Sequence, residues 1–200
     1  YGAPTGGQVM GAVLRHGPGT VAVVSTHLQP PPDRPPLEQA RDVADRLPDD
    51  DPDRLAMRIA PRALLCAHEY RIRSGRADVQ FRELKELCAI AGDDRSVAIG
   101  LAGLTLAVNL DTGPSASLVL ATELVRLVES IGDPSLRVSL CVSYLNAILA
   151  AGEISSALRL ADDVIELADG VTVGGELISV SPLANALAIR GTGRWCSGLA

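Results

Sequence analysis

The sequence predicts a mainly α fold in which antiparallel helical hairpins are stacked side by side, and three observations predict it. From about residue 55 to the end of the chain, small and apolar residues recur with a period of 40. Within each copy they fall at positions i, i+4, i+7 and i+10, which form the buried face of an amphipathic helix. A second stripe at helical spacing precedes each of these, so every copy holds two helices. Repeats of this length are typical of stacked helix pairs.

The residues expected in the core of these repeats are mostly small or aliphatic, as a chain with only 2% aromatic residues requires. Ser117 is the polar member of the second-helix stripe, and its small size makes burial tolerable. The predicted repeat core is Leu64, Ala77, Phe81, Leu84, Leu87, Leu104, Ser117, Ala121, Leu124, Leu127, Tyr144, Ala157, Ala161, Val164 and Leu167.

Composition and charge argue against several classes of function. The net charge of −6 disfavours general binding to a nucleic-acid backbone, which needs clustered Lys and Arg. Cys66, Cys88, Cys141 and Cys196 form no CxxC or CxxH pair, so we expect no zinc site and interpret them as small buried residues in a reducing cytoplasm. The chain shows neither a signal peptide nor a run of about 18 apolar residues, and we expect no membrane span.

The first 47 residues differ in kind from the repeat. Residues 8–14 and 20–26 are rich in Val and flank a Gly-Pro-Gly sequence, a pattern that predicts a β-hairpin. Prolines between positions 30 and 36 predict an extended loop, and apolar residues at helical spacing predict a helix over 37–47. Because a two-stranded hairpin is marginal in water by itself, we expect this N-terminal part to be weakly anchored.

Turn and cap residues divide the remainder into helices. The acidic run at 48–53 predicts a solvated linker that caps the next helix, since adjacent carboxylates in one short loop cannot converge on a metal ion. Gly-Asp pairs predict helix ends, Pro114 and Pro134 predict helix starts, and Pro61 is expected to bend its helix or to mark a fresh start. The helices are expected at about 54–74, 77–91, 94–109, 114–132, 134–152, 154–168 and 183–199.

The spacing of the helix pairs resembles the tetratricopeptide repeat. In the third copy Gly152 ends the first helix and Ala157 lies five residues on, where that motif has a turn glycine and a small residue. The period of 40 exceeds the usual length of about 34 residues, and the motif's Trp, Tyr and Pro positions are not kept. The predicted fold is a TPR-like stack of antiparallel helical hairpins with a short N-terminal β-hairpin and helix.

A second resemblance covers about residues 47–200. The runs LPDDDPDRLAMRIAPRALLC, ELKELCAIAGD, VRLVESIGDPS, VIELADG and SPLANALAIRGTGRWCSG resemble, in this order, the helical region of large actinobacterial ATP-binding regulators of the adenylate-cyclase or LuxR type. In those proteins an NTPase module precedes the helices. The resemblance implies a sensory or scaffolding module that binds a protein or a neighbouring domain. The chain has no P-loop and no cyclase metal-binding pair, so we expect neither activity and no cofactor.

Residues 8–46 resemble a different family. QVMGAVLRHGPGTVAVVSTHLQPPPDRPPLEQARDVADR is similar to a strand–loop–helix unit of the endonuclease/exonuclease/phosphatase superfamily of Mg²⁺-dependent phosphodiesterases. In that family a histidine in a Thr-His-Leu context contacts the scissile phosphate, and His27 matches it. The family's other metal and catalytic segments do not occur here, and phosphodiester chemistry needs several carboxylates. His27 is therefore interpreted first as a strand-end histidine with an ordinary hydrogen bond.

Three further residues are candidates for a functional site. His16 and His68 have no partners at a fixed spacing, and both are interpreted as structural. Trp195 beside Arg194 is compatible with a peptide-binding hot spot, but core packing of the indole is the favoured interpretation.

These observations predict two parts, which meet near residues 44–48 in a seam that suggests a fusion or chimera. Residues 1–47 are the β-hairpin and helix, and residues 48–200 are the TPR-like repeat domain. The predicted function is a non-catalytic, cytoplasmic interaction or regulatory module of a bacterial ATP-binding signalling or transcriptional regulator. We expect no metal, nucleic-acid or membrane binding, and self-association through the C-terminal edge, where the last helix lacks an outer partner. The alternative hypothesis is an incomplete Mg²⁺-dependent phosphodiesterase centred on His27.

Overall fold

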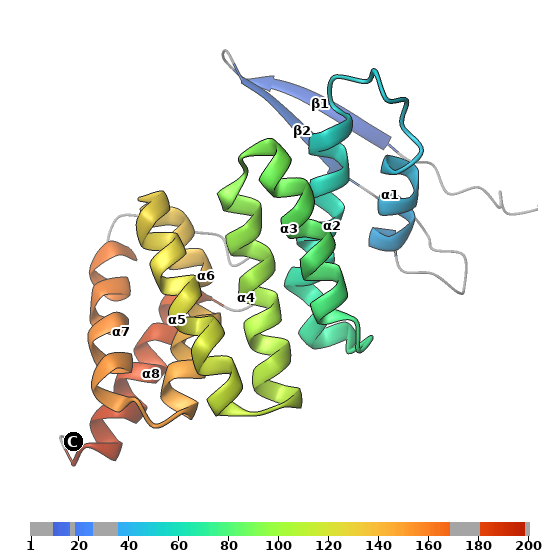
Figure 1. Cartoon of the computed structure of the whole chain (residues 1–200). Helices are drawn as coiled ribbons and strands as arrows, with labels where there is room; N and C mark the ends of the chain where they lie inside the picture. Colours follow the sequence, from blue (N-terminus) through green and yellow to red (C-terminus); the bar gives the residue numbers. More distant parts are fainter. Residues whose placement is uncertain (1–9, 17–18, 26–35, 169–180, 199–200) are drawn as a thin grey trace, which may run out of the picture.

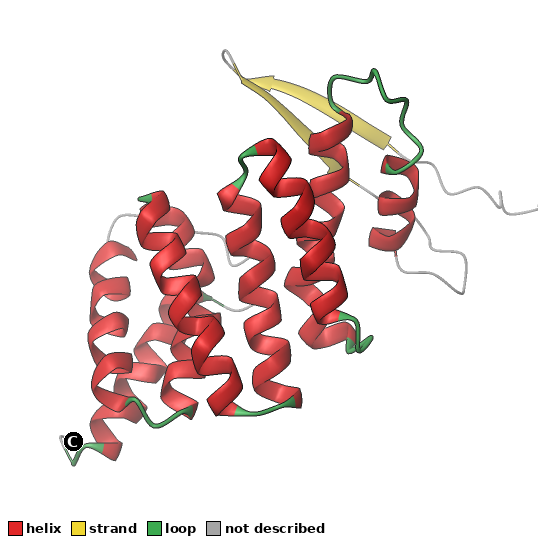
Figure 2. Ribbon diagram, in the orientation of Figure 1, coloured by secondary structure: helices red, strands yellow, loops and turns green. Residues whose placement is uncertain are grey.

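The computed structural model describes residues 10–16, 19–25, 36–168 and 181–198, and in these residues the chain is mainly helical, as predicted. Two strands pair antiparallel at the N-terminal end, with Met10 opposite Ser25 and His16 opposite Gly19. Figures 1 and 2 show the helices following one another across the molecule. The elements are β1 (Met10–His16), β2 (Gly19–Ser25), α1 (Pro36–Ala44), α2 (Arg54–Ile72), α3 (Ala77–Ala91), α4 (Asp94–Asp111), α5 (Pro114–Ile131), α6 (Pro134–Ala150), α7 (Ile154–Ala168) and α8 (Pro182–Cys196).

The helices form two layers. In the first layer, α2 contacts α4, α4 contacts α6, and α6 contacts α8. In the second layer, α3 lies on α2 and α4, α5 lies on α4 and α6, and α7 lies on α6 and α8 (Figure 1). A continuous buried core runs from α4 to α8, and a smaller cluster joins α2, α3 and α4.

Helix starts and ends repeat with the same period as the core. Asp93 and Asp133 are 40 residues apart and are the N-caps of α4 and α6. Their carboxylates accept hydrogen bonds from free backbone N–H groups, Asp93 from Ser96 and Asp133 from Ser135 and from the residue after it. The residue before each cap is a glycine with a φ of 67° or 69°, a left-handed conformation that ends the preceding helix.

The predicted repeat core lies inside these layers. Most of its members are buried, including Leu84, Leu124 and Val164 at equivalent positions of α3, α5 and α7. Ala77, Phe81, Leu127 and Leu167 are partly buried and pack against the main cluster, and Leu64 is partly buried as well. The face of each second-layer helix that meets the first layer is therefore built from positions 40 residues apart.

Pro61 does not interrupt its helix. The sequence suggests a bend or a fresh start there, but α2 runs continuously from Arg54 to Ile72. Pro61 is buried within this helix, whose other buried residues include Ala63 and Leu65. We attribute the continuity to the packing of α2 on α3 and α4, which outweighs the local cost of the missing N–H.

Helices α2 and α4 approach each other closely because Gly103 has no side chain. A Cβ placed on Gly103 would overlap the carbonyl oxygen of Cys66 and would lie 2.7 Å from the Cα of Ala67. No real Cβ tolerates such distances, so this crossing requires glycine. The residue 40 positions later, Ser143, is also small and fully buried.

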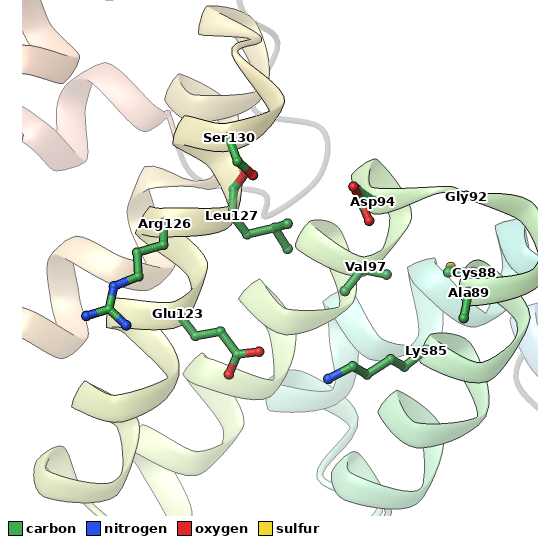
Figure 3. A pocket seen from close by; sticks show the side chains of 10 residues that line it. All are labelled: Lys85, Cys88, Ala89, Gly92, Asp94, Val97, Glu123, Arg126, Leu127 and Ser130. Atoms are coloured by element: carbon green, nitrogen blue, oxygen red, sulfur yellow. The ribbon is translucent and has the colours of Figure 1, made fainter.

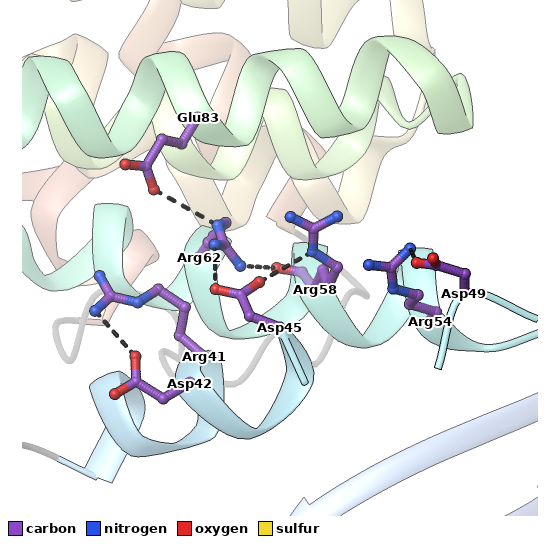
Figure 4. A network of polar contacts seen from close by, with 8 residues as sticks. All are labelled: Arg41, Asp42, Asp45, Asp49, Arg54, Arg58, Arg62 and Glu83. Carbon is purple, nitrogen blue, oxygen red and sulfur yellow. Dashed lines mark hydrogen bonds and ion pairs between the residues drawn. The ribbon is translucent and has the colours of Figure 1, made fainter. Parts of the chain in front are cut away.

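Helix α1 is docked onto α2, which differs from the weak anchoring that the sequence suggests for this helix. Ala44 at its end is 1% exposed, and Asp45 just beyond it bonds two arginines of α2 (Figure 4). The distances are 2.7 Å from Arg62 Nη2 to Asp45 Oδ2 and 3.0 Å from Arg58 Nε to Asp45 Oδ1. Arg62 also lies 3.7 Å from the carboxylate of Glu83 on α3, so one buried guanidinium joins three helices.

Candidate protein-binding grooves

The second-layer helices leave grooves between them. Within the described part of the chain, the backbones of α3 and α5 do not contact each other, and neither do those of α5 and α7. Each pair rests on the first-layer helix between them. The side chains that face across each gap therefore line a groove whose floor is α4 in one case and α6 in the other.

The first groove has two walls at regular helical spacing. Both sets follow the i, i+3, i+4, i+7 pattern, which places residues on one face of a helix. By 1.5 Å per residue the groove is roughly 10 Å long. Its volume is about 600 Å³. The α3 wall is Lys85, Cys88, Ala89 and Gly92, the α5 wall is Glu123, Arg126, Leu127 and Ser130, and Asp94 and Val97 of α4 lie between them (Figure 3).

The second groove is smaller, about 160 Å³. It lies between α5 and α7 over the start of α6 and is lined by Val128, Glu129, Leu167 and the turn residues before α6. Arg137 of α6 extends into it and reaches acidic residues on both neighbouring helices. This groove is largely closed by one side chain of the chain itself.

Charged groups of the first groove are arranged asymmetrically. Figure 3 shows the side chains of Lys85 and Glu123 extending toward each other from opposite walls, whereas the guanidinium of Arg126 points away from the gap. Between the charged groups the walls are small or apolar, notably Ala89 and Leu127. The groove thus offers an apolar channel with a carboxylate reaching into it.

Cys88 in this groove has little nucleophilic character. Burial raises the pKa of its thiol to about 11, so the sulfur is protonated at neutral pH. Burial likewise raises the pKa values of Cys66 and Cys141 to about 12. The arrangement favours binding through surface contacts over covalent chemistry at these thiols.

An ion pair connects the first-layer helices next to the second groove. Arg95 at the start of α4 bonds Asp133, the N-cap of α6. The hydrogen bond from Arg95 lowers the pKa of Asp133, and the backbone N–H groups that Asp133 caps act in the same direction. Asp133 therefore stays ionised, which suits both its arginine partner and the positive end of the helix dipole.

The structure describes two of the three histidines that the sequence singles out. His27 lies outside the described residues. His16 is the last residue of β1. His68 is in α2, where its Nδ1 lies 2.8 Å from the carbonyl oxygen of Leu64 within the same helix. A ring nitrogen bonded in this way fixes the ring, in keeping with the structural role expected for His68.

Two expectations about the last helix are wrong. Trp195 is 78% exposed, whereas the sequence favours core packing, and Cys196 is exposed while the other three cysteines are buried. Both residues lie at the end of α8, where Gly193 still packs against Leu158 of α7. Helical periodicity indicates which residues share a face, but it does not say which faces the neighbouring helices cover.

Sequence reasoning did not single out the groove residues, although a signal was present. Lys85, Cys88 and Ala89 lie beside the predicted core positions Leu84 and Leu87, on the edge of the apolar stripe. What makes this edge a groove is the separation of α3 from α5, which is a property of packing between repeats.

The described part of the chain shows no sign of a metal site or a membrane span. Among the described residues, no three His, Cys, Asp or Glu side chains gather where they could hold a metal ion. None of the described helices has the length and apolar character needed to cross a membrane. No family model, curated protein or solved structure matches the chain.

Proposed function

We propose that this chain is a non-catalytic protein-interaction module, a TPR-like helical stack from a larger bacterial ATP-binding signalling or transcriptional regulator of the cytoplasm. The observation that supports the proposal most is the open groove between α3 and α5. The resemblance of residues 47–200 to the helical region of such regulators supplies the context. The partner is a segment of another protein or of a neighbouring domain.

The groove has the features that a docked peptide needs. Its walls run parallel for about two helical turns, which suits a short segment lying along α3 and α5. Small side chains such as Ala89 and Gly92 let a peptide backbone come close, and Leu127 offers apolar contact. Charged residues at its edges provide specificity at modest energetic cost.

The proposal is tested by filling the groove. A displayed peptide library is selected on the full chain, and the enriched peptides are measured against Ala89→Phe, whose ring would occupy the channel. We expect binding to fall at least about tenfold in this variant. Ala150→Phe, at an exposed position at the end of α6, is the control and is expected to bind normally. Peptides that bind Ala89→Phe as well as the natural chain would contradict the proposal.

The same proposal assigns no phosphodiesterase activity to the chain. We expect the purified protein with Mg²⁺ to show no hydrolysis of phosphodiester substrates that EDTA suppresses. Activity that requires Mg²⁺ and disappears in His27→Ala would instead favour the alternative, the incomplete phosphodiesterase, because His27 is the residue that matches that family.

A further inference from the structure

The second groove already holds an arginine. Arg137 Nη2 lies 3.1 Å from Asp163 Oδ2 on α7 and 3.9 Å from Glu129 Oε1 on α5. Its side chain is 22% exposed, so the guanidinium is mostly enclosed between the two walls. The chain thus contains its own example of a cation bound between two second-layer helices.

The two grooves are built from equivalent positions. The glycine and aspartate that precede α4 and α6 are in the same 40-residue register, so positions on the helices can be paired directly. The pairs that matter are Arg137 with Val97, Glu129 with Ala89, and Asp163 with Glu123. The first groove therefore lacks the arginine and one acidic residue, but it has kept the acidic residue on the far wall.

The retained carboxylate points into open space. Figure 3 shows Glu123 directed into the first groove, and no ion pair joins it to another described residue. The volume at this position is about 600 Å³, compared with about 160 Å³ where Arg137 fills the equivalent place. Compared with the second groove, the first groove lacks a side chain with the length and charge of arginine.

We propose that the groove between α3 and α5 binds an arginine side chain of a partner peptide, with its guanidinium on Glu123. This rests on the proposed function and names the chemistry of the partner. The aliphatic part of the incoming arginine lies over Val97 and Leu127, while Ala89 and Gly92 leave room for the peptide backbone. A planar guanidinium with several N–H donors suits a carboxylate better than an ammonium does.

Lys85 is the competing cation. Its ammonium group faces Glu123 from the opposite wall, as Figure 3 shows. When the groove is empty, Lys85 screens the carboxylate, so removing it should help an arginine to bind. We expect Lys85→Ala to bind arginine-bearing peptides more tightly than the natural chain does. Weaker binding by Lys85→Ala would contradict the assignment of Glu123 as the receptor for the guanidinium.

One test needs no partner. The substitution Val97→Arg places an arginine in the groove from α4 itself. The unfolding equilibrium in urea is measured for the natural chain, Val97→Arg, Glu123→Gln and the double variant. If the groove accepts a guanidinium on Glu123, the factor by which Val97→Arg increases the unfolding equilibrium constant should be at least about threefold smaller when Glu123 is present than when it is replaced by Gln. Equal factors in the two backgrounds would overturn the inference. This result does not touch the proposed function, because it involves no peptide.

The second test uses the peptides selected on the full chain. We expect a fixed arginine among the enriched sequences, and at least about tenfold weaker binding to Glu123→Gln. Glu166→Gln, an exposed acidic position on α7, is the matched control and should bind normally. Peptides that bind Ala89→Phe weakly and yet lack an arginine, or that bind Ala89→Phe weakly and yet bind Glu123→Gln as well as the natural chain, are the contrary outcomes. Either result would overturn the inference and leave the proposed function standing. If no enriched peptide binds Ala89→Phe more weakly than the natural chain, both the inference and the proposed function would be overturned.

Discussion

At the scale of single residues, small side chains decide how closely the first-layer helices pack. Gly103 brings α4 against the backbone of α2 at Cys66, and Gly100 leaves room for the side chain of Leu84. The equivalent position to Gly103 in α6 is Ser143, whose buried hydroxyl has no hydrogen-bond partner among the described residues. The serine is therefore accommodated for its size more than for its polarity.

Replacing Gly103 tests this close approach. We expect Gly103→Ala to lower the free energy of unfolding by about 1–3 kcal/mol or more, because the new methyl group would force α4 away from α2. Gly191→Ala is the control, since a Cβ at that position of α8 meets nothing within 4 Å. It should leave stability unchanged or raise it by about 0.5–1 kcal/mol through better helix propensity. The free energy of unfolding of both variants is measured in urea, and equal changes in the two variants would contradict the packing argument.

Exposure of individual side chains is also decided at this scale. The stripe positions Leu84, Leu124 and Val164 could be read from their spacing, because a residue in the middle of an apolar face has neighbours on every side. Trp195 could not, because its burial depends on whether a neighbouring helix reaches it.

At the scale of elements, α1 is held to the array by the carboxylate of Asp45. The hydrogen bond from Arg62 lowers the pKa of Asp45, with further contributions from Arg58, while partial burial opposes this shift. A pKa lowered in the folded state means that the carboxylate stabilises the fold above the unfolded pKa of about 3.9. That stabilisation is lost as the pH falls below this value and through the folded pKa.

Asp45→Asn should therefore destabilise the chain in a pH-dependent way. At pH 7 we expect a loss of about 1–3 kcal/mol, since Arg62 stays buried without its carboxylate. Below about pH 4 the difference from the natural chain should shrink progressively, because the unfolded chain binds a proton at Asp45 there and the folded chain does so only at a lower pH. Urea unfolding across this range measures it. Asp50→Asn, on the exposed linker, is the control, and a pH-independent loss in Asp45→Asn would contradict the ion-pair account.

The docking of α1 also predicts where the chain can be shortened. Removal of residues 1–35 retains α1 and should leave the thermal transition close to that of the longer chain. Removal of residues 1–47 takes away Ala44 and Asp45 and should lower the melting temperature by roughly 5 °C, about 2 kcal/mol in a chain of this size. The melting temperatures of both shortened chains are measured by far-UV circular dichroism. If the two melt alike, α1 adds no stability and the seam near residues 44–48 remains a domain boundary.

At the scale of the whole molecule, the two layers are spaced differently. First-layer helices contact their neighbours in succession, whereas among the described elements the second-layer helices contact only the first layer, and α3, α5 and α7 stay apart. This difference creates the grooves. It also means that each groove lies between two repeats, so its shape and charge depend on residues that lie about 40 positions apart in the sequence.

The outer face of α8 predicts self-association. Leu183 and Leu187 are one turn apart on α8 and are both exposed, and Trp195 near the end of the same helix is exposed as well. We expect the chain to associate with increasing concentration in sedimentation velocity, and Leu183→Glu combined with Leu187→Glu to reduce this. Leu110→Glu, at an exposed leucine of α4, is the control. A monomer at high concentration in the natural chain would contradict the prediction.

The helical class, the 40-residue period and most helix limits can be predicted from the order of the residues alone. The limits predicted at 77–91 and 154–168 coincide with α3 and α7, because caps, turns and apolar periodicity act within one helix and its ends. Four features became visible only in the folded chain: α2 continues through Pro61, α1 docks through Asp45, Trp195 is exposed, and a groove opens above Val97. These features depend on distances between helices from different repeats. Packing between distant segments sets those distances, and no local pattern of residues encodes them.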